Sequence, residues 1–280
     1  SPLLAPLVGA ALAVAASACD RTVQPTEALP PLQATALDAD AGRWGMLVLS
    51  APDQIAVPAP APVTSDAYRA ELAAVRAAQA AITPAQRANV EYWSGGGVLR
   101  WNQVMRELVA RYNLPPAPRP DGSYPVPDAE NPFADPSFPF ANPPYAARAY
   151  SYVSVAQYEA LKAAWHWKFR HGRPAPAGVD AGVRALAPVG DLPAYPSEDA
   201  VLAGVTAEML KLLFPASVED ITRRAAAQRE AAILSGRATA SDAAAGLALG
   251  RAVAALVIAR ARADGMGGAA GTPALWQGLA

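Results

Sequence analysis

The residues with the clearest potential for chemistry lie in two short segments and in a basic pair upstream of them. The first segment is Pro196-Ser197-Glu198-Asp199, the second covers residues 235–242, and the basic residues are Lys168 and Arg173. Lysine and arginine side chains and a serine hydroxyl are groups that bind a phosphate-like anion through charge-assisted hydrogen bonds. A carboxylate at Asp199 opposes such an anion by like-charge repulsion. The pattern is therefore that of an anion site with one discordant residue.

From about Asn89 to about Gly265, the chain resembles the superfamily of type 2 phosphatidic acid phosphatases and vanadium-dependent haloperoxidases. The family motifs are Lys-x6-Arg-Pro, then Pro-Ser-Gly/Glu-His, then Ser-Arg-x3-Gly-x-His-x3-Asp. The resemblance implies a helical bundle whose pocket hydrolyses phosphomonoesters or holds vanadate. In that family one His is the nucleophile or the vanadium ligand, and the following Asp orients it. The His of the Pro-Ser motif is the general acid.

Nine positions make up the vestigial pocket that this resemblance implies. The retained residues are Lys168, Ser197, Gly236 and Asp242. The other positions are Asp199 for the acid His, Ala238 for the nucleophile His, Ala175 and Ala232 for the two Arg, and Arg173, two residues before Ala175. On this alignment both catalytic His and both anion-binding Arg are missing. We therefore expect no catalytic residue, no cofactor and no metal site.

The two histidines of the chain, His166 and His171, both precede the Pro-Ser segment and so cannot be the missing pair in a shifted alignment. The surviving pocket residues also have ordinary structural interpretations. Ser197 suits an N-cap, and an acidic residue such as Asp242 suits the first turn of a helix. Gly236 suits a helix C-terminus, and Lys168 can simply be solvated.

Composition excludes one class of function. The chain has 280 residues, a formal net charge of −1 and only 17% charged residues, so nothing favours nucleic-acid binding electrostatically. Its 28 prolines and high alanine content predict helices joined by extended loops. Its single cysteine, Cys19, cannot form an intrachain disulfide.

The N-terminal residues 2–18 are uncharged and apolar, and they are followed by Cys19-Asp20-Arg21. Such a segment is typical of a membrane anchor or of a signal peptide. Ala16-Ser17-Ala18-Cys19 also resembles a bacterial lipobox, in which Cys19 would be lipidated. Attachment through residues 1–19 or through Cys19 would in both cases place the rest of the chain in the bacterial periplasm, on the membrane.

Residues 20–64 are rich in Pro and Ala and are expected to form an extended arm. Within it, Trp44-Gly45-Met46-Leu47-Val48-Leu49 can form a short strand, lie on a partner, or pack back on its own domain. Residues 65–265 are expected to form the helical domain and residues 266–280 a C-terminal tail. Residues 114–144 form a proline-rich loop whose Phe133, Phe138 and Phe140 could cover the pocket or dock a neighbour.

Apolar periodicity and capping residues predict an all-α bundle without repeats or strand-rich regions. The expected helices cover residues 65–82, 84–93, 101–112, 145–169, 198–213, 217–234 and 241–264.

The functional hypothesis from the sequence is a membrane-anchored, extracytoplasmic pseudoenzyme that serves as an accessory or structural subunit of a larger membrane complex. One alternative is a protein that binds a small ligand in the emptied pocket near Ala175, Ala232 and Ala238. Another is an active phosphomonoesterase or haloperoxidase with a site rebuilt from His166, His171, Arg173 and Asp199.

Overall fold

The computed structural model describes residues 43–112, 119–123, 143–266, 274 and 278, and in these residues the regular secondary structure is helical, without a β-strand. The all-α prediction is confirmed. The elements are α1 (Asp66–Ala80), α2 (Pro84–Ser94), α3 (Gly97–Tyr112), α4 (Pro143–His171), α5 (Pro176–Val179), α6 (Glu198–Leu213), the 3-10 helix η2 (Pro215–Ser217), α7 (Val218–Leu234) and α8 (Ala240–Arg262).

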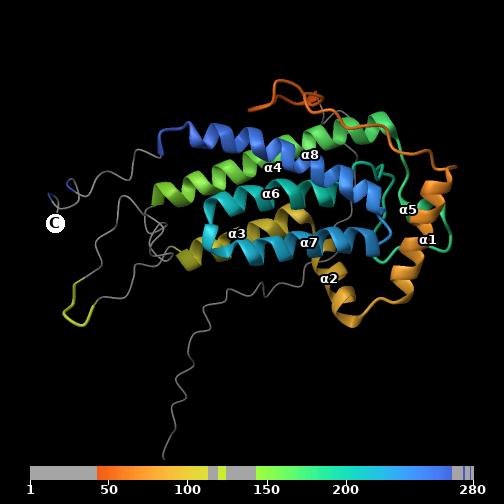
Figure 1. The fold of residues 1–280 in the computed structure, drawn as a ribbon, viewed down its shortest axis with the longest axis horizontal. Helices are drawn as coiled ribbons and strands as arrows, with labels where there is room; N and C mark the ends of the chain where they lie inside the picture. Colours follow the sequence, from red (N-terminus) through yellow and green to blue (C-terminus); the bar gives the residue numbers. More distant parts are fainter. Residues whose placement is uncertain (1–42, 113–118, 124–142, 267–273, 275–277, 279–280) are drawn as a thin grey trace, which may run out of the picture.

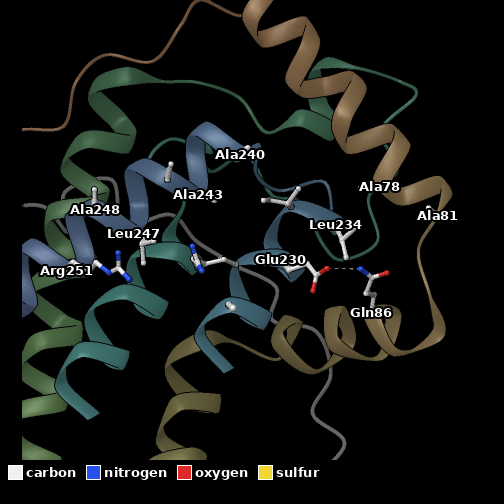
Figure 2. A pocket seen from close by; sticks show the side chains of 14 residues that line it. Ala78, Ala81, Gln86, Glu230, Leu234, Ala240, Ala243, Leu247, Ala248 and Arg251 are labelled. Carbon is white, nitrogen blue, oxygen red and sulfur yellow. Dashed lines mark hydrogen bonds between the residues drawn. The ribbon is translucent and has the colours of Figure 1, made fainter. Parts of the chain in front are cut away.

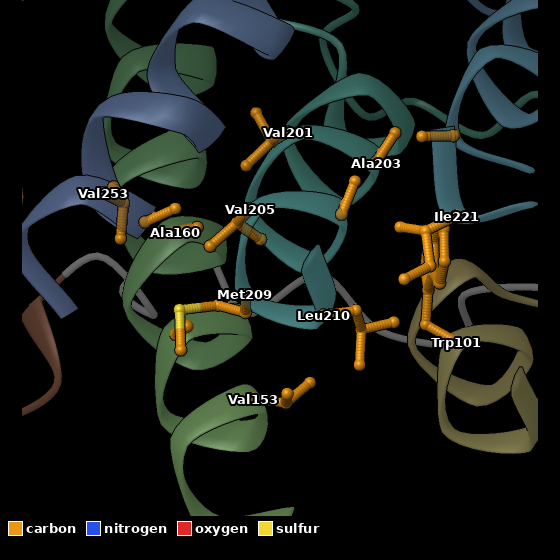
Figure 3. Close-up of a cluster of buried hydrophobic side chains, with 14 of the residues drawn as sticks. Trp101, Val153, Ala160, Val201, Ala203, Val205, Met209, Leu210, Ile221 and Val253 are labelled. Carbon is orange, nitrogen blue, oxygen red and sulfur yellow. The ribbon is translucent and has the colours of Figure 1, made fainter. Parts of the chain in front are cut away.

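The helices α3, α4, α6, α7 and α8 run along the long axis of the molecule, and α1 crosses one end of them (Figure 1). Helix α6 is central, because it packs against α3, α4, α7 and α8. The core surrounds it: Figure 3 shows Val201, Val205 and Met209 of α6 facing Val253 of α8 and Ala160 of α4. Helix α8 is long and apolar enough to cross a membrane by length and composition, a test that the core helix of a bundle also passes.

Local signals place the helix starts close to the expected positions. Ser65 caps α1, and Thr83 forms a capping box with Gln86 at the start of α2, with Pro84 in the first turn. Helix α3 begins earlier than expected, at Gly97. A Cβ atom at Gly97 would lie 2.6 Å from Gln228 Nε2, so this glycine allows α3 to pack closely against α7.

Two glycines bring the backbones of α6 and α8 into direct contact. A Cβ atom at Gly246 would lie 2.3 Å from the Ser197 carbonyl oxygen, and one at Gly250 would lie 2.2 Å from the Val201 carbonyl oxygen. Only glycine permits this approach. The contact fixes the start of α6 against the second and third turns of α8. The starts of these two helices carry the predicted pocket residues Ser197, Asp199 and Asp242.

The described part of the arm, residues 43–64, packs back on the chain's own domain. Glu159 of α4 is fully buried and accepts backbone N–H bonds from Leu47 at 2.7 Å, Val48 at 3.2 Å and Leu49 at 2.8 Å. Further along, the Trp167 indole donates to the Ile55 carbonyl oxygen at 3.0 Å. Among the three alternatives for residues 44–49, the structure thus supports packing on helix α4.

Several predictions fall outside the described residues. These are the anchor at residues 1–19 with Cys19, the arm up to residue 42, the loop aromatics Phe133, Phe138 and Phe140, and most of the C-terminal tail. The expected limits of the helical domain stay predictions.

Candidate functional site

The predicted pocket residues meet at one end of the bundle, where α4 and α7 end and α6 and α8 begin. The backbone N–H of Ser197 donates to the Asp242 carbonyl oxygen at 3.0 Å, which joins the two helix starts. Gly236, with a φ of 81°, ends α7, as its predicted role requires. Ser197 caps α6 by accepting the backbone N–H of Ala200 at 3.4 Å.

Arg173 extends from the loop after α4 to the end of the bundle where α6 and α8 begin, and only 3% of its surface is exposed. Its guanidinium donates to Ser241 Oγ at 3.1 Å and to Thr239 Oγ1 at 3.3 Å. It lies over the Tyr68 ring at 4.2 Å, a cation–π arrangement. The motif spacing predicts Ala175, and not Arg173, at the position of the family arginine. In the structure Arg173 reaches the first turn of α8, whereas Ala175 is buried as the N-cap of α5.

Glu71 of α1 supplies the counter-charge for Arg173. Its carboxylate accepts the backbone N–H of Ser241 at 2.8 Å, the Ser241 hydroxyl at 2.8 Å and Arg173 Nη2 at 3.1 Å. The first turn of a helix and an arginine fork are both strong acceptor sites for an anion. The chain's own carboxylate therefore fills an anion position at the start of α8.

Asp242 is fully buried and forms a capping box with Thr239, whose backbone N–H it accepts at 2.6 Å. Its Oδ1 lies 3.5 Å from Arg173 Nη1. Burial raises the pKa of Asp242, and the Arg173 charge and the Thr239 hydrogen bonds oppose this rise. Asp242 thus has the structural role in the helix start that its position predicted.

Asp199, at the expected position of the acid His, pairs with Arg237 at 2.8 Å. The side chains are 16% and 26% exposed, so the pair is largely shielded from water. Neighbouring Glu198 accepts the Trp165 indole N–H at 2.8 Å. The first turn of α6 thus presents two carboxylates, each with its own donor.

Lys168 is buried, with 3% of its surface exposed, and its Nζ donates to the Pro193 carbonyl oxygen at 2.5 Å. The interpretation of Lys168 as a solvated residue is therefore wrong. The loop before α6 covers the end of its side chain. Burial lowers the pKa of Lys168, and the carboxylates of Glu198, Asp199 and Asp242 oppose this fall.

The three alanines at expected family positions are closely packed by neighbouring atoms. Ala175, Ala232 and Ala238 are 7%, 0% and 1% exposed, and the Ala238 N–H donates to the Ala232 carbonyl oxygen at 3.2 Å. The methyl groups of these residues offer neither a nucleophile nor a cation. None of the three lines the cavity described next.

A cavity of about 660 Å³ lies between α7 and α8, beside the C-terminal end of α1 and the N-terminal end of α2 (Figure 2). Its α8 wall includes Ala243, Leu247 and Arg251. None of the nine predicted pocket residues lines this cavity. The cavity is therefore separate from the predicted pocket.

The histidines do not join the charged groups of the pocket. His171 contacts the Val57 carbonyl oxygen at 3.2 Å and stacks on Trp167, so it helps to hold the arm. His166 meets the Trp167 ring edge-on. Among the described residues, no group of three or more His, Cys, Asp or Glu side chains could hold a metal ion.

Sequence reasoning missed Glu71, Tyr68, Thr239 and Arg237. Glu71 and Tyr68 belong to α1, which precedes the motifs, and no local pattern links α1 to α8. A capping signal was available for Thr239, because Asp242 stands three residues after it.

No protein-family model and no curated protein matches the chain. Among solved structures, a bacterial vanadium-dependent iodoperoxidase superposes with a TM-score of 0.55 at 17% identity, over 82% of this chain and 60% of that one. An apo-type bacterial vanadium-dependent chloroperoxidase superposes with a TM-score of 0.59 at 16% identity, over 78% of this chain and 55% of that one. The chain thus has the vanadium-dependent haloperoxidase fold, which confirms the predicted architecture, and spans less than two thirds of either structure's length.

Proposed function

We propose that this chain is a non-catalytic protein on a haloperoxidase-like scaffold, which acts as a membrane-anchored accessory or structural subunit of a larger extracytoplasmic complex. The observation that carries the proposal is the internal neutralisation of the pocket. Its cations are Lys168, Arg173 and Arg237, and its carboxylates are Glu71, Glu198, Asp199 and Asp242. Each cation already faces a carboxylate of the same chain, and this arrangement opposes the binding of a further oxyanion.

The residues do not fit a bound vanadate or phosphate, the groups that the fold implies. Such an anion needs several free cationic donors and a histidine, either as ligand or as nucleophile. The nucleophile position is a buried Ala238, and Arg173 is already bonded to Glu71. Asp199 adds a negative charge where the family has its acid. This misfit supports loss of both vanadium-dependent oxidation and phosphate hydrolysis.

Membrane attachment through residues 1–19 or a lipidated Cys19, and a periplasmic location, are parts of the proposal that rest on the sequence. The apolar surface offers starting points for a contact: Trp44 and Leu47 of the packed arm are 51% and 63% exposed.

Two alternatives have less support. A ligand in the emptied pocket would require space near Ala175, Ala232 and Ala238, and all three are buried by neighbouring atoms. A rebuilt catalytic site would require His171 near Asp199, but His171 contacts the Val57 carbonyl oxygen while Asp199 pairs with Arg237.

Activity assays on the purified protein test the enzymatic part of the proposal. p-Nitrophenyl phosphate hydrolysis, and iodide or bromide oxidation with hydrogen peroxide after incubation with vanadate, should stay at the level of a no-protein blank. Turnover by the wild type that disappears in Lys168→Ala would refute the non-catalytic assignment.

A native gel of gently solubilised membranes from the source organism, probed for this chain, tests the subunit role. We expect migration in a large complex whose other proteins identify the assembly. Migration as a single species near 28.9 kDa would refute the accessory-subunit role.

A further inference from the structure

The start of helix α8 holds a complete receptor for a carboxylate, and its ligand is a side chain of the same protein. The receptor consists of the Ser241 backbone N–H, the Ser241 hydroxyl and the Arg173 guanidinium, which all donate to Glu71 at 2.8–3.1 Å. Backbone N–H groups in the first turn of a helix, together with an arginine, form a recurrent anion-binding arrangement.

Contacts other than those to Glu71 hold the donor groups of this receptor in place. Ser241 is held in α8, whose start is fixed by the Thr239–Asp242 capping box. Arg173 comes from the loop after α4, and its side chain is only 2% exposed. Its Nε has no hydrogen-bond partner, and its remaining carboxylate contact, Asp242, is 3.5 Å away. Without Glu71, the buried guanidinium would keep Asp242 as its carboxylate partner across this longer distance, and its Nη2 would lose the charged acceptor at 3.1 Å.

Helix α1, which carries Glu71, packs separately from the main core. Its buried residues Tyr68, Leu72 and Val75 form a small cluster with Val183, distinct from the core around α6. A helix with so small an apolar contact depends strongly on its polar anchors. The Glu71 carboxylate is the anchor that joins α1 to α8.

We propose that the start of α8 is a carboxylate-binding site that Glu71 occupies as a resident ligand, so that a free carboxylate can take its place once the Glu71 side chain is shortened. The ligand class is a small monocarboxylate. The inference goes beyond the proposed accessory role and holds whether or not a partner complex exists.

Glu71→Ala tests the site directly, because it removes two carbons and two oxygens, which is the heavy-atom composition of acetate. The thermal midpoint of this variant is measured in sodium acetate and in sodium chloride at equal ionic strength and pH 7. We expect saturable stabilisation by acetate. At 20 times the dissociation constant, the folding equilibrium constant should rise by about 20-fold.

Glu71→Gln is the matched control, because its neutral side chain keeps the volume filled and leaves no room for acetate. Glu91→Ala, an exposed glutamate of α2, controls for general salt effects. Acetate should give neither control, nor the wild type, a larger shift than chloride does.

Equal midpoints of folded Glu71→Ala in acetate and chloride would overturn the proposal. If orthophosphate or orthovanadate stabilises the variant more strongly than acetate, the carboxylate assignment is also wrong, and the site is a retained oxyanion site. If Glu71→Ala does not fold in chloride, it should refold in acetate. Failure to fold in both salts, while Glu71→Gln folds, would likewise overturn the proposal.

Discussion

Substitution of Gly250 by alanine tests whether the contact between α6 and α8 is as close as the structure has it. The added Cβ atom would lie 2.2 Å from the Val201 carbonyl oxygen and 2.9 Å from the Val205 amide nitrogen, whereas ordinary contacts begin at 3.4 Å. Both obstacles are backbone atoms, which cannot rotate away. The two helices must therefore separate locally by about 1 Å, as the overlap in an overpacked core requires.

Helix propensity and overpacking act in opposite directions on the free energy of unfolding of Gly250→Ala. Alanine favours the helix over glycine by about 1 kcal/mol. Overpacking costs about 1–3 kcal/mol, and a rigid backbone obstacle places the cost at the upper end of this range. We expect Gly250→Ala to lower the free energy of unfolding by about 2 kcal/mol. The thermal midpoint should then fall by about 4–8 °C in a domain of this size.

Gly178→Ala is the matched control for this experiment. Gly178 lies in the short helix α5, and a Cβ atom there meets no heavy atom within 4 Å. It should leave the protein unchanged or more stable by about 0.4–1 kcal/mol, because alanine restricts the unfolded chain. Both variants are compared by urea denaturation and calorimetry. If Gly250→Ala proves as stable as Gly178→Ala, the close backbone contact is refuted.

Three further predictions concern buried or partly buried charges. The pKa of Lys168 is lowered from its ordinary value of 10.5, so the unfolded state binds more protons between the folded-state pKa and 10.5, and the free energy of unfolding rises with pH there. Lys168→Met should abolish this rise, measured by urea denaturation from pH 7 to 10. The same rise with pH in the variant would contradict the lowered pKa of Lys168. Glu159→Gln should lower the free energy of unfolding by about 2–3 kcal/mol, since three backbone N–H groups lose a charged acceptor. Amide hydrogen exchange at residues 47–49 should accelerate, and unchanged exchange rates would show that Glu159 does not hold these residues. The Asp199–Arg237 pair should give a coupling energy of about 1 kcal/mol in a double-mutant cycle with Asp199→Asn and Arg237→Gln, whereas strict additivity would argue against it.

Helix positions could be predicted because their signals are local. Ser65 and Thr83 cap the helices that follow them, and Gly236 with positive φ stops α7. Such signals act over three or four residues, so a single sequence contains them in full. The fold prediction also followed from a resemblance that depends on spacing between motifs.

The counter-charges of the pocket could not be predicted in the same way. Glu71 and Ser241 are 170 positions apart, and the helical periodicity of α1 does not indicate a polar partner for Glu71. The burial of Lys168 depends on the loop that carries Pro193, whose path is not encoded by any periodicity. The sequence includes Arg173 among the pocket residues, but motif spacing does not indicate that its counter-charge is Glu71 of α1.

The glycine contact between α6 and α8 makes the frame of the pocket independent of the pocket's own side chains. Because Gly246 and Gly250 set the distance between the two backbones, substitutions of side chains at the two helix starts can change the chemistry there without moving either helix. The same pair of helices is therefore compatible with more than one set of pocket residues.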